Sequence, residues 1–267
     1  MSDVTQLSGF LEQLGRFFQE TSFLQLDFHS NGGLSFSHYR SPGPIASEQG
    51  RSETGLLPYE ANSFGTVFNL GSIGLLDDAA LSQGLKELRR IAKHNIWIAV
   101  EKSANRDRLW WETVFFEAGF RKHPLSQKVV GFEDIQNESG GITLLFEKIP
   151  DEALKRYPLA ALKTERDLHM DMLRESGVRA EAHLARYQLS AAYAKNAGVI
   201  LDVACGLGYG SALLARQYPN ARIIGIDIST YAIDYARANF ASVLPNLEFH
   251  VADACELSMI PEGSVDL

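Results

Sequence analysis

The hydrophobic positions of this chain alternate between short apolar runs and segments with helical spacing. Runs such as IWIAV at residues 96–100 have the length of a buried strand, and longer segments repeat apolar residues every three to four positions. The pattern predicts strands at residues 23–28, 66–70, 96–100, 129–132 and 142–147, and helices at residues 7–18, 78–93 and 106–118. Strands that alternate with helices of this length indicate a layered α/β sheet.

Three other stretches complete the predicted organisation. Residues 41–55 contain Pro42, Pro44 and several Ser and Gly, which predicts an irregular loop. Residues 151–197 are charged and helix-forming with a break near Gly177, and we expect two connecting helices there. The β-α-β pattern then returns, with strands at residues 199–203, 222–226 and 247–251 and helices at residues 210–217 and 230–240.

A strand, a glycine turn and a helix follow one another at residues 199–211 (VILDVACGLGYGS). The strand ends at Val203, Gly206 and Gly208 form the turn, and Ser211 opens the helix. Glycine suits such a turn because a Cβ would block both the backbone conformation and the approach of a ligand. The free N–H groups at the start of the helix face that ligand. The segment therefore predicts a nucleotide-type site.

Two further strand ends place carboxylates at the same edge of the predicted sheet. The strand IIGID ends in Asp227, 19 positions after Gly208, where an acid can accept hydrogen bonds from both ribose hydroxyls of an adenosine. The third strand ends in VADA, which brings Asp253 to this edge. Ligands bind at this edge in open α/β sheets. Three successive strands that each end in a residue suited to ligand binding are stronger evidence for a site than the glycines alone.

The spacing of the glycines separates two classes of nucleotide. A dinucleotide fingerprint reads G-x-G-x-x-G, whereas here Gly210 comes one position early and Ser211 occupies the last required position. That mismatch argues against NAD or FAD, and so against a dinucleotide oxidoreductase. The pattern resembles the class I S-adenosylmethionine (SAM)-dependent methyltransferases. Their first motif resembles residues 202–208, the acid of their second motif corresponds to Asp227, and their third motif resembles residues 252–254.

The resemblance implies SAM as the cofactor and gives a role to each residue of these motifs. The methionine part of SAM would be lined by Asp202, Ala204 and Gly206, in a turn that also contains Cys205 and Gly208. Ala204 departs from the family, which usually has its first glycine there, although a small residue is kept. The adenosine part would be held by Asp227 at the ribose, Ile228 against the adenine ring, and Asp253 with its neighbour Ala254 at the adenine amino group.

The approach to the first strand of this region also resembles a subset of the family. Residues 183–187 (HLARY) are similar to members that modify sugars and cell-surface glycans, and by that resemblance Arg186 or Tyr187 would contact the SAM carboxylate. The alternative is a helix that packs on the sheet with Arg186 in solvent. Both readings stay open from the sequence.

The family's seven-stranded sheet cannot be completed from residues 199–267 alone. Residues 263–267 (GSVDL) resemble the entry to its fourth strand, and residues 60–148 resemble the half that follows. In a tandem arrangement, residues 1–150 form a degenerate methyltransferase-like domain. Residues 151–197 are then a helical connector, and residues 198–267 form the first half of a second Rossmann-like, doubly wound domain, truncated at Leu267.

The alternative is a circularly permuted domain in which the two halves close one sheet. The tandem arrangement is favoured because residues 23–28 and 34–37 look like eroded first strands. The first of these contains Asp27, but no G-x-G follows it.

Composition excludes several other classes. The net charge of −8 gives no attraction to phosphate backbones, so no nucleic-acid partner is expected. The N-terminus lacks a signal-peptide pattern, and no apolar run reaches the length of a membrane span, which favours a cytoplasmic protein. Cys205 and Cys255 do not form a metal-type pair, and we expect structural thiols and no metal site. A homodimer is left open.

The predicted function is a SAM-dependent methyltransferase that acts on a small molecule or a glycan. The alternative is a catalytically silent binding or regulatory module. An oxygen acceptor would need a general base, for which His183 and His250 are the candidates, although His250 falls in a predicted strand. No catalytic residue is assigned from the sequence, and the acceptor is not identified by it.

Overall fold

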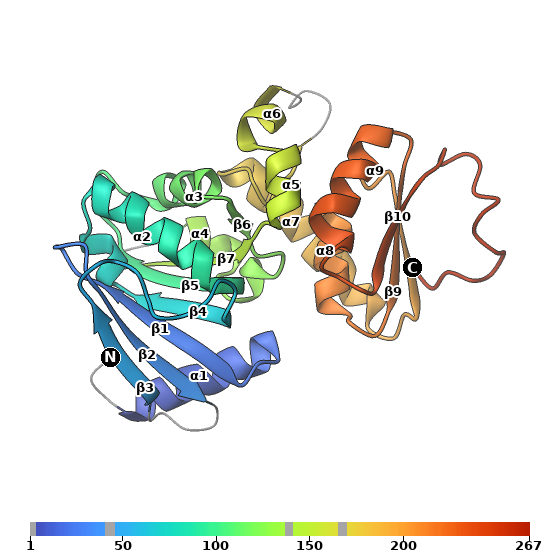
Figure 1. Ribbon diagram of the computed structural model, residues 1–267. Helices are drawn as coiled ribbons and strands as arrows, with labels where there is room; N and C mark the ends of the chain where they lie inside the picture. Colours follow the sequence, from blue (N-terminus) through green and yellow to red (C-terminus); the bar gives the residue numbers. More distant parts are fainter. Residues whose placement is uncertain (1–3, 41–45, 137–140, 165–169) are drawn as a thin grey trace. The chain divides into compact units, whose positions relative to one another are not determined.

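The computed structural model describes residues 4–40, 46–136, 141–164 and 170–267 (Figure 1). The chain folds into two compact units. The N-terminal unit comprises Met1–Lys122 and Glu138–Lys148, and the C-terminal unit comprises His123–Asn137 and Ile149–Leu267. Each unit has its own sheet, with seven strands in the first and three in the second.

The N-terminal sheet has the strand order β3-β2-β1-β4-β5-β7-β6. Its strands are β1 (Ser22–Phe28), β2 (Leu34–Arg40), β3 (Ala46–Ser52), β4 (Phe64–Leu70), β5 (Ala92–Glu101), β6 (Phe120–Lys122) and β7 (Gly141–Lys148). The three central strands β1, β4 and β5 are parallel. The outer pairs β1–β2, β2–β3, β5–β7 and β6–β7 are antiparallel. The predicted α/β class is confirmed.

Helices cover both faces of this sheet. Figure 1 shows α2 (Asp78–Ile91) and α3 (Arg108–Glu117) on one face and α1 (Val4–Phe18) on the other. The apolar side of α1 buries Leu11 and Leu14 in a cluster with Phe23 and Phe68 of the sheet. Asp77 and Asp107 are the N-caps of α2 and α3, and each side chain accepts a backbone N–H of the first helical turn. Short 3-10 turns lie at Ser72–Leu75 and Ser126–Lys128.

Two sequence-based predictions between residues 46 and 132 are wrong. Residues 46–52, predicted as loop, form the edge strand β3, whose polar side chains are mostly exposed. Backbone pairing with β2 holds this strand, so it leaves no hydrophobic alternation in the sequence. Residues 129–132, predicted as a strand, instead end a 3-10 turn and begin α4 (Phe132–Gln136). The three-residue strand β6 was not predicted, because two of its residues are buried charged side chains, Arg121 and Lys122.

The C-terminal unit begins with helices and ends in a parallel sheet. The helices before the sheet are α4, α5 (Asp151–Arg156), α6 (Leu159–Thr164) and α7 (Val178–Ala191), followed by a 3-10 turn at Ala192–Ala194. Gly177 lies directly before α7 with a positive φ of 90°, so the predicted break is confirmed, although the described part of residues 151–197 contains three α-helices where two were expected. None of the helices in the described ranges has the length and apolar content that a membrane crossing needs.

The three-stranded sheet has the order β10-β9-β8. Its strands are β8 (Val199–Val203), β9 (Arg222–Asp227) and β10 (Leu247–Val251), and the predicted limits of these strands agree to within one residue. Figure 1 shows α8 (Tyr209–Gln217) and α9 (Thr230–Ala236) on one face of this sheet. A π-helical turn at Arg237–Ala241 continues α9 over the residues predicted as its last turn.

Residues 266 and 267 run along the free edge of β8. Asp266 N donates to Val199 O at 3.0 Å, and Leu201 N donates to Leu267 O at 2.8 Å. The Asp266 carboxylate also accepts the N–H groups of Gly198 and Val199, and these bonds lower the pKa of Asp266. Backbone pairing therefore extends the sheet beyond β8.

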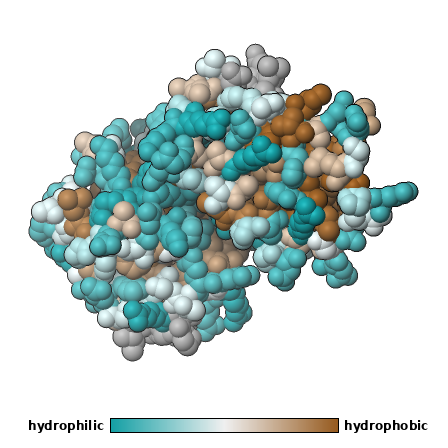
Figure 2. Space-filling view, turned by 45° about the vertical axis from the view of Figure 1, so that its right-hand side comes forward, coloured by the Kyte–Doolittle hydropathy of each residue, from teal (hydrophilic) through white to brown (hydrophobic). Residues whose placement is uncertain are grey.

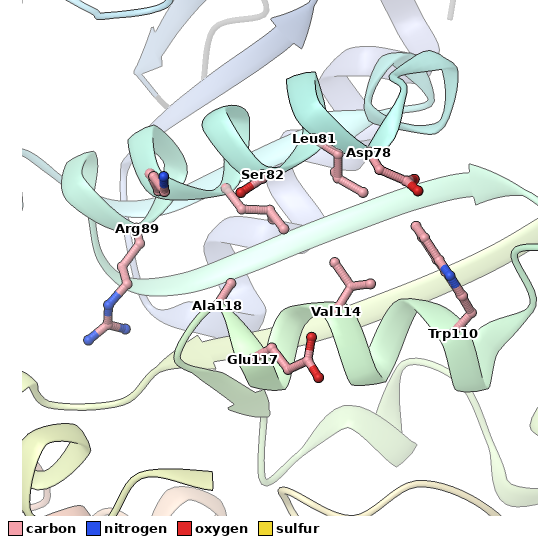
Figure 3. A pocket seen from close by; sticks show the side chains of 10 residues that line it. Asp78, Leu81, Ser82, Arg89, Trp110, Val114, Glu117 and Ala118 are labelled. Carbon is pink, nitrogen blue, oxygen red and sulfur yellow. The ribbon is translucent and has the colours of Figure 1, made fainter. Parts of the chain in front are cut away.

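A pocket of about 540 Å³ lies between α2 and α3 of the N-terminal unit (Figure 3). The first turns of the two helices contribute Asp78 and Trp110 to one end of it, and Arg89 and Glu117 lie towards the other end. None of the residues predicted to bind a nucleotide lines this pocket. The helix-lined pocket and the predicted site are therefore separate features.

Candidate functional site

The turn after β8 has an alternating backbone conformation. Ala204, Gly206 and Gly208 all have positive φ, at 57°, 56° and 81°. Cys205 N donates to Ile226 O at 2.9 Å, which connects the turn to the neighbouring strand β9. Gly208 N donates to Cys205 O at 3.0 Å within the turn. Left-handed backbone is normal for glycine but costs an alanine about 1–2 kcal/mol. The predicted glycine turn is therefore present, and it contains a strained alanine.

Asp202 occupies the penultimate position of β8 and is held by two hydroxyl groups. Ser211 Oγ donates to its Oδ2 at 2.6 Å, and Tyr187 Oη lies 3.2 and 3.3 Å from its two carboxylate oxygens. Burial raises the pKa of Asp202, and the charge of Asp227 adds to this effect, whereas the two hydroxyl donors lower it. Asp202 is thus a largely enclosed acid beside the turn.

Asp227, the last residue of β9, links the turn to the next helix. Its Oδ2 accepts Gly206 N and its Oδ1 accepts Ser229 N, both at 2.9 Å. Ser229 in turn caps α9 by accepting Ala232 N. A carboxylate has about four acceptor positions, so each oxygen keeps a lone pair for a ligand hydroxyl.

The carboxyl ends of the three strands expose apolar side chains beside these acids. Val203, Ile228 and Val251 are 43%, 72% and 45% exposed. Figure 2 shows hydrophobic residues gathered on the surface of this unit. Asp253 is exposed two residues after β10, and its Oδ1 accepts Cys255 N at 2.8 Å, while Ala254 between them is exposed as well. Polar acceptors and apolar surface thus meet at one edge of the sheet.

Helix α7 packs on the turn through Tyr187. A Cβ on Gly210 would come within 1.9 Å of the Tyr187 ring, so glycine at this position allows the ring to lie on the first turn of α8. The Tyr187 hydroxyl faces Asp202, and burial is the main cause of its raised pKa. Arg186, the neighbouring residue, is exposed. The predicted approach segment therefore lies against the turn, with Tyr187 directed at Asp202.

A histidine–tyrosine pair lies next to the turn. His183 Nδ1 on α7 is 3.3 Å from Tyr209 Oη, and Tyr209 directly follows Gly208. Burial lowers the pKa of His183, and the positive charges of Arg186 and Arg179 lower it further. Burial and the charge of Asp171 raise the pKa of Tyr209 to about 12. His250, the other predicted base, lies on β10 with its Nε2 3.6 Å from Glu248 Oε2.

The two cysteines are free thiols, as predicted. Cys205 is buried within the turn, and burial raises its pKa, which keeps the thiol protonated at neutral pH. Cys255 is exposed. Over the described ranges, no three His, Cys, Asp or Glu side chains come together in a way that could hold a metal ion.

Sequence reasoning missed the partners that hold the turn in place. Ser211 was predicted to open the helix and to break the dinucleotide fingerprint, yet α8 begins at Tyr209, and Ser211 is fully buried and donates to Asp202. Tyr209 was not singled out, although its position directly after the second glycine of the turn was a usable signal. The contact between Tyr187 and Gly210 had no sequence signal, because it depends on how α7 packs against α8.

Comparison with known proteins agrees with this geometry. Residues 200–267 match the family model described as "Methyltransferase domain". Similar curated proteins include a trans-aconitate 2-methyltransferase of Methylobacterium radiotolerans, 40% identical over 67 residues, which are 25% of this chain and 24% of that protein. A malonyl-[acyl-carrier protein] O-methyltransferase of Acetivibrio thermocellus is 45% identical over 60 residues, which are 22% of this chain and 20% of that protein.

A third similar protein is a release factor glutamine methyltransferase of Koribacter versatilis, 39% identical over 64 residues, which are 24% of this chain and 22% of that protein. The chain therefore spans less than a quarter of the length of these relatives. Among solved structures, the bifunctional kinase-methyltransferase WbdD matches at 25% identity, covering 43% of this chain and 26% of that one. The TM-score of this match is 0.29. On the family model and the curated relatives, residues 200–267 are similar to methyltransferase domains.

Proposed function

We propose that the C-terminal unit binds SAM and that the protein transfers its methyl group to a small molecule or a glycan. The observation that carries this proposal is the turn between β8 and α8. Three residues of this turn have positive φ, and Asp227 supports it from the neighbouring strand. The alternative of a catalytically silent module keeps the same turn but predicts no turnover.

The chemistry of the residues present fits SAM. No atom lies within 4 Å of the position where a Cβ on Gly206 would stand, so the backbone can be approached there. Asp227 and Asp253 supply carboxylate acceptors, and the exposed side chain of Ile228 supplies an apolar surface for an adenine ring. In this proposal Asp202, Ala204 and Gly206 hold the methionine part of SAM, Asp227 holds the ribose, and Ile228 and Asp253 hold the adenine.

The chain's own residues bind and orient the reactants in this proposal. Bound SAM supplies a methyl group already activated by a sulfonium, so alignment and the exclusion of water are the main requirements of transfer. The fixed turn and the buried Asp202 orient the donor, and the apolar ends of the three strands exclude water. Arg186 is exposed next to this turn, where its charge is available to a carboxylate.

The acceptor is the less constrained part of the proposal. The names of the similar proteins indicate three different acceptors: an organic acid, a carrier-bound acyl group and a glutamine of a protein. Similarity over this segment therefore does not identify the acceptor. The glycan alternative rests on the resemblance of residues 183–187 to sugar-modifying members of the family.

His183 is the better placed of the two candidate bases for an oxygen acceptor. Its lowered pKa keeps the ring neutral at neutral pH, so the ring can accept a proton there. Its partner Tyr209 is part of the turn region, whereas His250 lies beside a carboxylate on β10. We therefore propose that His183, and not His250, receives the acceptor's proton.

The N-terminal unit is proposed to be a methyltransferase-like domain without a cofactor site, as in a tandem protein. It has seven strands, the number that the family's sheet has. Its first strand β1, however, leads through a short turn at residues 29–33 directly into the antiparallel strand β2, with no G-x-G turn and no helix between them. That connection removes the helix N-terminus that a nucleotide needs.

Calorimetric titration of SAM into the full chain tests this function. We expect binding in the micromolar range for the wild type and at least a tenfold loss, about 1.4 kcal/mol, in Asp227→Ala. The matched control is Asp27→Ala in the N-terminal unit, which should leave the affinity unchanged. No heat up to high micromolar SAM contradicts cofactor binding, and an unchanged affinity in Asp227→Ala contradicts the residue assignment.

A further inference from the structure

The turn at residues 171–174, between α6 and α7, contains a buried arginine with an incomplete set of partners. Arg174 is 4% exposed, and its Nη1 donates to Tyr157 O at 2.9 Å. The Nε and Nη2 atoms of the same guanidinium are buried and have no hydrogen-bond partner among the described residues. The hydroxyl of Tyr157, a residue that is also 4% exposed, is buried and unpartnered in the same part of the structure. Among the described residues, three donor atoms on two contacting residues therefore lack an acceptor.

Asp171, three positions before Arg174, is already engaged elsewhere. Asp171 Oδ1 accepts Leu173 N at 2.9 Å, and its Oδ2 accepts Tyr235 Oη at 2.7 Å. Within the described ranges, no carboxylate forms an ion pair with Arg174. Burying guanidinium donors without an acceptor is destabilising, so Nε and Nη2 favour an anionic group. The flat fork of the guanidinium matches the two oxygens of a carboxylate or a phosphate.

Tyr157 packs on the helix that follows Asp227 of the proposed methyl-transfer site. The ring of Tyr157 is 5.8 Å from that of Tyr231 and 5.0 Å from that of Tyr235, both on α9. Helix α9 starts directly after Ser229, whose N–H donates to Asp227. Two contacts, one between rings and one along the helix, therefore connect the donors to the ribose carboxylate of the proposed site.

We propose that Arg174 and Tyr157 form a subsite for an oxyanion, a carboxylate or a phosphate, on a molecule bound to the C-terminal unit. The group comes either from the methionine end of SAM or from an acidic acceptor. This placement next to the methyl donor rests on the proposed function, but the binding of an oxyanion does not depend on it. In either case Nε and Nη2 donate to two oxygens, and Tyr157 Oη donates to a third lone pair.

Inorganic phosphate is the first probe, titrated into the full chain by calorimetry. We expect Arg174→Gln to weaken phosphate binding at least tenfold and Tyr157→Phe about threefold, in line with the loss of charged and neutral hydrogen bonds. The matched control is Arg179→Gln, which removes the same charge from an exposed position on the first turn of α7. Equal phosphate affinity in Arg174→Gln and Arg179→Gln, together with equal SAM affinity, overturns the proposal.

A second pair of titrations identifies the source of the oxyanion. SAM carries a carboxylate, and 5′-methylthioadenosine does not. If Arg174→Gln weakens SAM binding and leaves 5′-methylthioadenosine binding unchanged, the subsite takes the carboxylate of SAM. If both affinities are unchanged while phosphate binding falls, it takes an acidic group of the acceptor. Failure of the wild type to bind SAM would contradict the proposed function, but the phosphate titration would still test the oxyanion subsite.

The Tyr157→Phe variant keeps the proposal testable if Arg174→Gln does not fold. Removing an unpartnered buried hydroxyl should leave the melting temperature of the phosphate-free protein unchanged or raise it. The rise in melting temperature on adding phosphate should be smaller than in the wild type. A variant that melts lower without phosphate and gains as much from it as the wild type would contradict a role for this hydroxyl.

Discussion

Asp27 and Asp202 are each the penultimate residue of the first strand of a sheet, yet the surroundings of the two acids differ. In the N-terminal unit, Gln25 Nε2 and Ser72 Oγ donate to the Asp27 carboxylate at 2.8 and 3.3 Å, and the chain then turns back into β2. In the C-terminal unit, Asp202 is followed by a turn with three positive φ angles and by the N-terminus of α8.

A second contrast lies on the strands beside these acids. Asn69 of β4 uses its side chain entirely within the N-terminal unit, donating to Leu26 O and Ser72 Oγ and accepting from Gly71 N and Ile73 N. Ile228, after β9, exposes 72% of its surface at the corresponding edge of the other unit. The comparison teaches that the connections after the strands decide whether this edge of a sheet is filled by the unit's own side chains or left exposed.

The largest effect on this comparison is expected from Gly208→Ala. The added Cβ would lie 2.7 Å from the Phe249 ring and 2.8 Å from Ala236 Cβ, at a φ of +81°. Strain and overpacking together should cost about 3 kcal/mol of unfolding free energy and reduce SAM affinity by about a hundredfold. Chemical denaturation and calorimetry measure the two quantities. In the N-terminal unit, Gly32→Ala at φ +82° meets no atom within 4 Å, so it should cost only about 1–2 kcal/mol and leave SAM binding intact.

Removal of the Tyr187 hydroxyl should have the next largest effect. In Tyr187→Phe, Asp202 loses one of the two hydroxyl donors seen among the described residues and keeps Ser211. We expect the free energy of unfolding to fall by about 1 kcal/mol and the SAM affinity to fall about fivefold. The pKa of Asp202 should rise further, which a pH series of SAM binding can detect. Tyr193→Phe, at a side chain 84% exposed, is the control. Equal behaviour of the two variants would mean that α7 does not support the cofactor turn.

Asp202→Asn should change stability and SAM affinity in opposite directions. Because burial raises the pKa of Asp202 above its ordinary value of 3.8, its charged form disfavours folding at neutral pH. The variant should therefore melt at a higher temperature than the wild type at pH 7 and bind SAM more weakly. Its advantage should shrink as the pH falls through the raised pKa towards 3.8, because the wild-type carboxylate then becomes neutral on its own. Melting curves between pH 4 and 7 check the sign, and a variant that is less stable at pH 7 contradicts it.

The smallest effect is expected at Ala204. Ala204→Gly removes the cost of a left-handed alanine and adds the entropy cost of glycine, for a net gain of about 0.5 kcal/mol. Gln19→Gly, at φ +56° in the N-terminal unit, should gain a similar amount without any change in SAM binding. A loss of stability in Ala204→Gly, measured by denaturation, would show that the alanine methyl makes contacts that outweigh the strain.

Local patterns were enough to predict most elements. The apolar run of β8 and the acid that ends β9 were visible in the sequence, because a buried strand must be apolar and a sheet edge tolerates charge. Strand β3 was missed for the opposite reason, since its residues face solvent and only the backbone of β2 pairs with them. Residues 129–132 are mostly apolar, which predicted a strand, but the structure pairs them with no strand and begins α4 at Phe132.

By itself, then, the sequence determined the nucleotide-type turn and the acids that flank it, because the spacing of glycines and strand ends is a local property of the chain. Only the tertiary structure decided which side chains support that turn. Tyr187 reaches Asp202 across 15 positions because Gly210 leaves room for its ring, and Arg174 meets Tyr157 across 17 positions. Such contacts depend on how helices pack, and packing is set by side-chain volumes from the whole unit, which no local pattern records.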